Sequence, residues 1–288
     1  MKDHKDAKLA LNELVHGIRE LVDGFAVTLE ENSDQPRINM NEPAGIMNEP
    51  AGIAKRASPP FPSISVVIPT LNEARNLPYV LPLIPTWVHE IIIVDGRSTD
   101  DTIAVARELR DDVRIVLEPR RGTGAALRRG FGAASGDIIV MMDADGSMNA
   151  NELILLVAAL MSGADVAKGS RFIEGGGSSD LSILRTAGNW GLTTAVRVLY
   201  GGRFSDLCYG YMAFWRRCLP ALDSRRDGFE IEACLNVLAI KNNLKIIEVP
   251  SFEAERIHGA SNLRAFSDGW RVLKTILEER VKAVAPAH

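Results

Sequence analysis

The stretch DIIVMMDADGSM, residues 137–148, places two carboxylates one residue apart directly after an apolar run. The run at 138–142 predicts a strand that is buried on both faces, as in a parallel sheet. Asp143 and Asp145 then follow the strand end, and the two-residue period puts them on the same side. Two carboxylates this close repel each other and raise one pKa unless a cation lies between them. The pair indicates either a solvated turn, in which Asp and Gly are common, or a functional site.

The elements that must position these acids begin at residue 63, where short β-branched runs alternate with helical patterns. The expected strands are 64–69, 90–95, 113–118 and 137–143, and the expected helices are 73–84, 100–110, 123–134 and 151–162. This alternation predicts right-handed βαβ units and a mostly parallel sheet that binds ligands beyond the carboxyl ends of its strands. Glu73, which follows Pro69, and Asp95 also come directly after strands. Acids that gather at one sheet edge favour the functional interpretation.

The second half of the chain alternates less regularly. The expected strands are 164–172, 206–216 and 245–252, and the expected helices are 182–199, 229–243 and 262–283. The segment EGGGSSD at 174–180 is expected to be a mobile loop, because consecutive glycines impose little conformational constraint.

The composition is that of a soluble globular protein, with 46% apolar and 24% charged residues among 288. The net charge of −4 argues against general nucleic-acid binding. Cys208, Cys218 and Cys234 share no ligand-like spacing and indicate reduced thiols. No signal peptide and no run of about 20 apolar residues is recognised. We therefore expect a cytoplasmic protein that is soluble or at most peripheral at the inner face of the membrane.

The N-terminal part has a different residue pattern from the rest of the chain. Residues 6–31 carry apolar side chains at helical spacing, which predicts an amphipathic helix that packs on the body or on a second subunit. The direct repeat MNEPAGI, at 40–46 and 47–53, and the prolines after it predict an extended linker. No chemistry is assigned to the repeat, and a homo-oligomer remains open.

Several motifs in one order resemble a known family. They are VVIPTLNEARNL, IIIVDGRSTDDT, RRGTGAALRRGF, DADGSM and GSRF, followed by GFEIE and EVPSFEAERIHGASNLRAF. The series resembles the family 2 glycosyltransferases of the GT-A fold, and within them the dolichyl-phosphate mannose synthases and related polyprenyl-phosphate glycosyltransferases. The resemblance implies an α/β GT-A domain over 63–264, between an N-terminal extension at 1–62 and a C-terminal amphipathic helix at 265–288.

The resemblance implies a divalent cation at the Asp pair, which is then a DXD motif. Mg²⁺ or Mn²⁺ held by Asp143 and Asp145 would act as a Lewis acid on a nucleotide-sugar diphosphate and remove the carboxylate repulsion. The position of a third ligand in the family is occupied here by Ser147, a neutral and weaker ligand.

The resemblance also assigns a set of residues to the nucleotide-sugar donor. They are Pro69, Leu71, Glu73, Asp95, Gly122, Asp143, Ala144 and Arg256. Pro69 and Leu71 would form an apolar wall for the base, and Glu73 and Asp95 would bind base and ribose. Helix capping by Asp95 or Ser98 is the structural alternative.

On the acceptor side, the resemblance implies that Arg171 and Arg185 hold a phosphate, with Asn189 one turn further on. An arginine fork suits phosphate, although a salt bridge to a neighbouring acid is the structural alternative for both arginines. The loop 174–180 would be a lid over the acceptor entrance.

The stretch with Arg256, His258 and Ser261 closes over the donor in the family. A lysine common in the family is replaced here by Asn262, so Arg256 or Arg264 would have to compensate.

The predicted reaction is direct displacement with inversion, in which Asp145, Arg171 and Arg185 act mainly by positioning and charge stabilisation. A polyprenyl phosphate is already anionic and needs no base; a hydroxyl acceptor would need one, with Asp145 or Asp206 as candidates. Donors of the GDP-mannose or UDP-glucose type, and small acceptors such as a phosphoglycerate, remain open. PTLNEARN lacks the glycine-rich basic loop of a sugar-phosphate nucleotidyltransferase, and the DXD motif with Arg171 argues against a non-catalytic binder.

Overall fold

The computed structural model describes residues 61–259 and 265–282. Some predicted features lie outside these residues: the helix 6–31, the repeat 40–53, Ser261, Asn262 and Arg264. The division of the chain into three parts stays a prediction.

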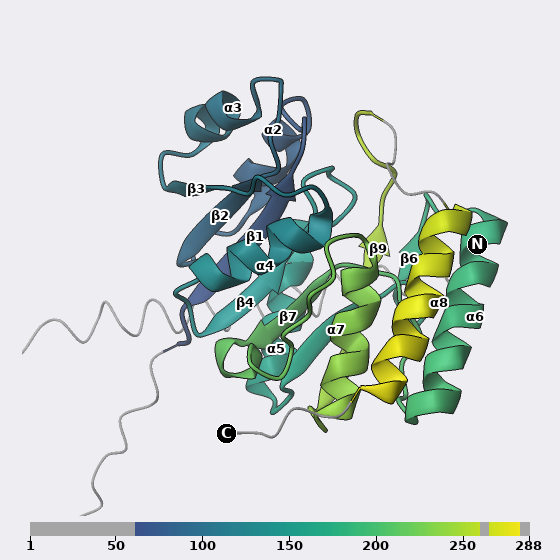
Figure 1. The fold of residues 1–288 in the computed structure, drawn as a ribbon. Coiled ribbons are helices and arrows are strands. Elements are labelled where there is room, and N and C mark those ends of the chain that lie inside the picture. Colours follow the sequence, from purple (N-terminus) through teal and green to yellow (C-terminus); the bar gives the residue numbers. More distant parts are fainter. Residues whose placement is uncertain (1–60, 260–264, 283–288) are drawn as a thin grey trace, which may run out of the picture. The chain divides into compact units, whose positions relative to one another are not determined.

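Within the described residues, seven strands form one sheet in the order β3-β2-β1-β4-β7-β5-β8 (Figure 1). The strands are β1 (Ile64–Thr70), β2 (Glu90–Asp95), β3 (Val113–Leu117), β4 (Ile138–Met141), β5 (Val166–Ser170), β7 (Met212–Trp215) and β8 (Ile246–Pro250). β7 runs antiparallel to its neighbours β4 and β5, and the other pairs are parallel. The predicted mostly parallel α/β sheet is confirmed.

Helices flank this sheet, most of them where the sequence patterns predict them. They are α2 (Leu77–Val80), α3 (Thr102–Leu109), α4 (Thr123–Ala133), α5 (Leu153–Met161), α6 (Ile183–Tyr200), α7 (Glu230–Lys241) and α8 (Ala265–Val281). The expected helix 73–84 was too long, because only the short α2 and a 3₁₀ turn at Leu81–Leu83 form there. Pro82 has no N–H to donate and its ring crowds the carbonyl one turn earlier, so a regular helix cannot continue.

Two expectations in the second half also need correction. The expected strand 206–216 begins only at Met212, because the preceding backbone bonds to side chains instead: Asp206 N–H to Glu248 and Cys208 N–H to Asn189. The expected loop 174–180 contains a short strand, β6 (Gly177–Ser178), which pairs with β9 (Phe252–Glu253). The mobility of this loop stays a prediction.

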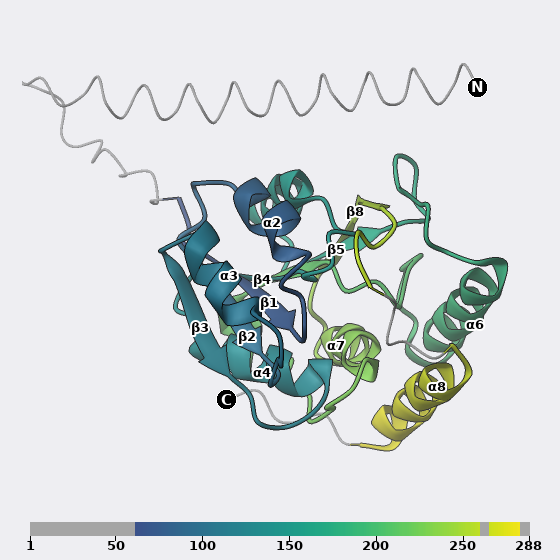
Figure 2. The same ribbon diagram turned by 90° about the horizontal axis from the view of Figure 1, so that it is seen from above.

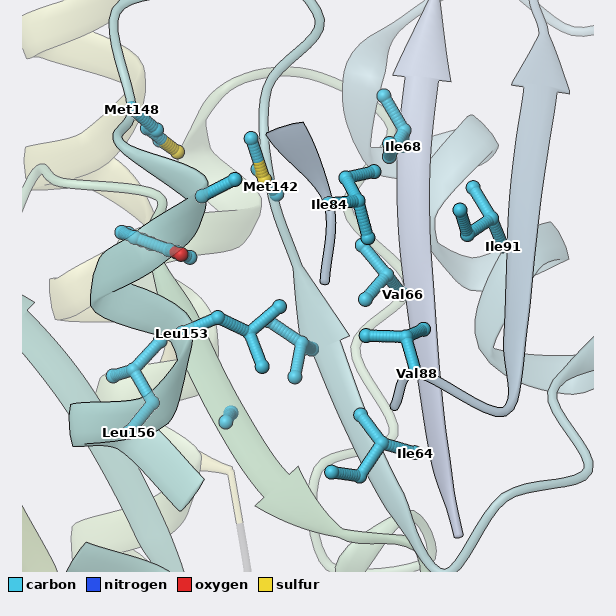
Figure 3. Close-up of a cluster of buried hydrophobic side chains, with 14 of the residues drawn as sticks. Ile64, Val66, Ile68, Ile84, Val88, Ile91, Met142, Met148, Leu153 and Leu156 are labelled. Atoms are coloured by element: carbon cyan, nitrogen blue, oxygen red, sulfur yellow. The ribbon is translucent and has the colours of Figure 1, made fainter. Parts of the chain in front are cut away.

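The sheet buries both of its faces. One cluster joins alternate residues of β1 to α5 (Figure 3): Ile64, Val66, Ile68, Leu153 and Leu156. Val67 points to the opposite cluster, which includes Leu127 of α4 and Leu235 of α7. Two covered faces explain why the strands are continuously apolar.

α6 and α8 lie side by side at one end of the sheet (Figures 1 and 2). A third cluster packs Val196 of α6 and Val272 and Ile276 of α8 against Val237 of α7. The outer faces of the two helices expose large apolar side chains: Ile183, Leu184, Trp190, Val198, Phe266, Trp270, Leu277 and Val281. Across 61–259 and 265–282, no helix is both long and apolar enough to cross a membrane.

Candidate functional site

A cavity of about 730 Å³, here called the edge cavity, opens at the carboxyl ends of β1 and β4. Most of the residues predicted to bind the donor and metal line it: Pro69, Leu71, Glu73, Gly122, Asp143, Ala144, Asp145 and Arg256. The parallel pairing of β1 with β2 and β4 brings these strand ends to one edge. The sequence motifs therefore converge in space as the topology predicts.

The Asp pair lies in a tight turn directly after β4. Gly146 has a φ of 81°, a left-handed conformation that favours glycine, and Asp145 Oδ1 accepts a hydrogen bond from Ser147 N at 2.9 Å. Asp143 N donates to Met148 Sδ at 3.3 Å. The pair does form a turn, but not a solvated one, because Asp145 is buried and both residues line the edge cavity. A functional role of the pair stays a prediction.

The segment before α8 lies over this turn. Ala254 N donates to Ser147 O at 2.9 Å, and Ile257 N donates to Asp145 O at 3.2 Å. A Cβ at Gly146 would lie 2.4 Å from Ile257 Cδ1, so glycine is also needed for this approach.

Arg256, held between these two contacts, joins the two acidic parts of the edge cavity. Its guanidinium donates to Glu73 Oε1 at 3.1 Å and lies 3.0 Å from Asp145 Oδ2. The ring of His258 packs on Tyr79, with 5.7 Å between the ring centroids. Arg256 is therefore the cation that lies beside the Asp pair.

The surroundings of Asp143 disfavour the charged form of its carboxyl group. Burial raises its pKa well above the usual value, and the charges of Asp145 and Glu232 raise it further. Arg256 acts in the opposite direction but does not offset these effects. A carboxylate in this condition is one that a bound cation would stabilise.

The two carboxylates fit a cation that takes its remaining ligands from elsewhere. In the described part of the chain, no cluster of three or more His, Cys, Asp or Glu side chains could hold a metal ion. Mg²⁺ commonly binds through one or two carboxylates, with phosphate and water completing its shell. Ser147 is buried but lines a neighbouring cavity with the Asp pair, so its hydroxyl is near enough to remain a candidate.

Asp95 lies just outside the edge cavity, and the next two residues, Gly96 and Arg97, line it. Its Oδ2 accepts the N–H groups of Arg97 and Ser98, both at 3.0 Å. The helix-capping alternative was wrong, because the N-cap residue of α3 is Asp101 and no side chain caps this helix. Asp95 Oδ1 is buried and has no partner among the described residues.

Gly122 lines the edge cavity, but the close approach it permits is to protein. With a φ of 112°, a Cβ there would lie 2.0 Å from the carbonyl oxygen of Asp227. Gly124 N donates to the same carbonyl at 2.8 Å. The glycines of RRGTG therefore fit α4 against the chain before α7.

Arg171 forms the salt bridges that the sequence left open as an alternative. Its guanidinium binds both oxygens of Asp206, at 2.7 and 2.8 Å, and Glu253 Oε2 at 3.0 Å. Its side chain is only 3% exposed, and that of Asp206 is fully buried. Asp206 is therefore closed to substrate as a general base, and a direct contact of Arg171 with an acceptor stays a prediction.

Arg185 and Asn189 lie on α6 beside Arg171. Arg185 Nη1 lies 2.6 Å from Asp180 Oδ2, in an ion pair that is open to solvent. Asn189 Oδ1 accepts from Cys208 N at 3.0 Å, and its buried Nδ2 has no partner among the described residues.

Two further cavities adjoin the edge cavity. The polar cavity, about 380 Å³, contains the Asp pair and Arg185. The helix cavity, about 410 Å³, lies between α6, α7 and α8 and is lined by Leu184, Leu192, Phe266 and Val272, with Arg171, Arg185 and Asn189. Phe229 lines all three cavities. The predicted donor and acceptor residues thus surround one connected region.

Several lining residues were not predicted from the sequence: Arg97, Phe229, Glu232, Ser267, Asp268 and Arg271. Phe229 and Glu232 belong to the GFEIE motif, which was the available signal. Burial raises the pKa of Glu232 to about 7, although the charges of Lys168 and Arg171 lower it.

Known proteins resemble this chain in sequence. An uncharacterized glycosyltransferase of Mycobacterium tuberculosis is 46% identical over 109 residues, which are 38% of this chain and 49% of that protein. The alignment thus spans about half the length of this relative. The polyprenol monophosphomannose synthase of Mycolicibacterium smegmatis is 36% identical over 214 residues, covering 69% of this chain and 80% of that protein.

A solved structure and a family model agree with these relatives. Glucosyl-3-phosphoglycerate synthase from Mycobacterium tuberculosis, solved with Mn²⁺, UDP and phosphoglyceric acid, is 25% identical with a TM-score of 0.61, covering 76% of this chain and 79% of that one. The predicted GT-A fold is confirmed. Residues 65–220 match the model of glycosyl transferase family 2. The predicted family is therefore confirmed, and this chain belongs to glycosyl transferase family 2.

Proposed function

We propose that this chain is a metal-dependent, inverting glycosyltransferase that moves a hexose from a nucleotide sugar to a polyprenyl phosphate. The observation that carries this proposal is the arrangement of the three cavities around Phe229. An acidic and arginine-lined cavity for a nucleotide diphosphate shares its lining, through a polar space, with an apolar cavity between two helices.

The donor side of the proposal rests on the edge cavity. Pro69 and Leu71 offer the apolar wall for a base, and Arg97, Arg121, Arg256 and Arg271 bring positive charge around the position of a diphosphate. Mg²⁺ or Mn²⁺ at Asp143 and Asp145 would supply Lewis-acid stabilisation of the departing diphosphate. The related structure contains Mn²⁺ and UDP, which supports a divalent cation and a nucleotide at this edge.

The acceptor side rests on the helix cavity and on the surface into which it opens. Leu184 and Phe266 line this cavity and are also exposed on α6 and α8, 54% and 82% respectively. Arg185 lines both the helix cavity and the polar cavity, so it lies where a phosphate would follow an apolar chain. A polyprenyl phosphate combines an apolar chain with a phosphate. The relative of this chain from Mycolicibacterium smegmatis is named for such a substrate.

The exposed side chains of α6 and α8 support peripheral contact with a membrane. Trp190 and Trp270 are 70% and 66% exposed, and α6 carries no acidic residue. Exposed tryptophans beside other exposed apolar side chains favour the lipid–water interface. A membrane at this face would present the lipid acceptor directly to the helix cavity.

In the proposed reaction, the acceptor phosphate oxygen attacks the anomeric carbon and the nucleoside diphosphate leaves. The phosphate is already anionic, so no side chain has to remove a proton. Arg185 exchanges Asp180 for the acceptor phosphate, and Arg256 exchanges Asp145 for the diphosphate. Arg171 is held by Asp206 and Glu253, and this buried group positions the acceptor side of the site. Catalysis then arises from positioning and charge stabilisation.

A small soluble acceptor is the second candidate. The polar cavity is lined by Arg185 and is large enough for a small phosphorylated molecule, and a related structure contains phosphoglyceric acid. In that case the helix cavity has no role in substrate binding.

One assay separates these candidates. Radiolabelled GDP-mannose and UDP-glucose are incubated with the full chain, Mn²⁺ and either a short polyprenyl phosphate or 3-phosphoglycerate. We expect transfer to the polyprenyl phosphate that stops when EDTA removes the metal. Transfer to phosphoglycerate alone would establish the second candidate, and no transfer from any nucleotide sugar would overturn both.

A further inference from the structure

Glu232 is a carboxylate that the proposed reaction does not use, at the centre of the site. It lies in the first turn of α7 and lines both the polar cavity and the helix cavity. In the polar cavity it shares the lining with Asp143, Asp145 and Arg185. It therefore lies between the position of the diphosphate and the position of the acceptor.

The carboxylate of Glu232 has no hydrogen bond or ion pair within 61–259 and 265–282, unlike Asp206, Glu248 and Glu253 nearby. Asp206 accepts from Arg171, Glu253 accepts from Arg171 and Ser178, and Glu248 accepts from Ser205. A half-buried carboxylate without donors is costly, because it has lost water and gained nothing in return. The two oxygens are therefore available to hydroxyl donors from a ligand.

This carboxylate lies over Gly210. A Cβ at Gly210 would lie 3.0 Å from Glu232 Oε1 and 3.3 Å from its Cδ, so the absent side chain makes room for the carboxylate. Lys168 is fully buried nearby, where its Nζ donates to Tyr209 O at 2.6 Å. The positive charges of Lys168 and Arg171 lower the pKa of Glu232, but burial outweighs them and raises this pKa to about 7.

From this geometry we infer that Glu232 binds hydroxyl groups of the donor sugar and thereby sets which hexose the chain transfers. This inference rests on the proposed function. A carboxylate has two acceptor oxygens and no donor, which matches the O–H groups of neighbouring sugar carbons. A site built to pair with a hydroxyl rejects an epimer that moves it, because the buried oxygen is then left without a donor.

The test compares Glu232→Gln and Glu232→Ala with the matched control Glu230→Gln. Glu230 lies in the same turn and outside the three cavities, and its hydrogen bond from Gly228 N, 3.3 Å, can be kept by the glutamine oxygen. Transfer is measured as kcat/KM for the preferred sugar and for its C2 and C4 epimers on the same nucleotide. Binding of the sugar-free nucleoside diphosphate with Mn²⁺ reports on folding and on the edge cavity.

We expect Glu232→Ala to lower kcat/KM for the preferred sugar by about 30-fold or more and to bring epimer preference close to unity. Nucleoside diphosphate binding should stay as in the wild type, and Glu230→Gln should keep the wild-type preference. An unchanged epimer ratio in both Glu232 variants would overturn the inference, as would an equal loss for every sugar, which indicates a role in the chemical step.

Failure of the proposed function would be distinguishable from failure of this inference. If the wild type transfers no sugar, the proposed function is wrong, but binding of the nucleotide sugar relative to the free nucleotide still reports on Glu232. If Glu232→Ala binds the nucleotide sugar no more tightly relative to the free nucleotide than expected without sugar contacts, sugar recognition by Glu232 is supported. If the ratio of the two affinities equals that of the wild type, the inference is refuted.

Discussion

Arg256 and Arg171 each contact two carboxylates, yet they lie in regions that work differently. Arg256, in the edge cavity, is 24% exposed and bridges Glu73 and Asp145, which are each 12% exposed. Arg171, beneath the acceptor side, is 3% exposed and its partners are at most 10% exposed. A solvent-accessible pair can exchange for a ligand at small cost, whereas a buried pair cannot be broken without leaving charges unpaired. The ion pairs of Arg256 in the edge cavity can therefore be replaced by a ligand, whereas the buried ion pairs of Arg171 on the acceptor side stay fixed.

The largest expected effect comes from removing the Asp pair in the edge cavity. Replacing both Asp143 and Asp145 with alanine should lower sugar transfer by about 10³-fold or more, because no carboxylate remains to hold a cation at the diphosphate. Mn²⁺-dependent binding of the nucleotide sugar, measured by calorimetry, should be lost together with transfer.

The matched control removes two exposed acids at the amino end of β3, Asp111 and Asp112. This double alanine variant should bind and transfer as the wild type does. Transfer that survives in the Asp143/Asp145 variant would contradict the proposed metal-dependent function.

The next largest effect concerns the buried ion pairs of Arg171. Arg171→Ala should lower the free energy of unfolding by about 3–5 kcal/mol, because Asp206 and Glu253 are left buried without their partner. Urea unfolding measures this change. A loss below about 1 kcal/mol, accompanied by weaker acceptor binding, would instead favour the direct acceptor contact predicted from the sequence.

The same pair predicts a pH dependence. Burial raises the pKa of Asp206, but hydrogen bonds and charge from Arg171 outweigh this effect and lower it below the usual value. The stability gained is present above the unfolded pKa, about 3.9, and is lost as pH falls through the folded value. Urea unfolding between pH 7 and pH 3 should therefore show a smaller acid-side loss in Arg171→Ala than in the wild type.

Arg256→Ala should give the opposite result to Arg171→Ala. The free energy of unfolding should fall by less than in Arg171→Ala, since Arg256 is 24% exposed and Arg171 only 3%. Affinity for the nucleotide sugar should fall by about 10- to 100-fold, because one charge-assisted contact to the diphosphate is removed. Arg256→Lys, measured by the same calorimetry, should recover part of the affinity; an unchanged affinity in Arg256→Ala would remove the contrast between the two regions.

The two regions also differ in how far the sequence predicted them. In the edge cavity, Glu73, Asp143 and Asp145 each follow a strand, and parallel pairing alone brings strand ends together. Local pattern and topology were enough there.

On the acceptor side, the environment of a side chain depends on residues far away in the chain. Arg171 points to Asp206 and Glu253, which are 35 and 82 residues away. Glu232 was missed because the pattern of its helix does not single it out, and its position beside two cavities follows from the tertiary structure. No spacing rule in a single sequence encodes these contacts.

The smallest expected effect concerns the exposed face of α6 and α8, beside the helix cavity. Replacing Trp190 and Trp270 with alanine should weaken partition onto lipid vesicles by about tenfold, because two exposed aromatic rings no longer enter the interface. Transfer to a short, water-soluble polyprenyl phosphate should remain, since neither tryptophan lines the helix cavity. Leu117→Ala removes a 61% exposed apolar side chain from β3 and serves as the control in vesicle sedimentation. Equal partition of wild type and the double variant would show that the membrane does not meet this face, and the acceptor would then have to reach the helix cavity from solution.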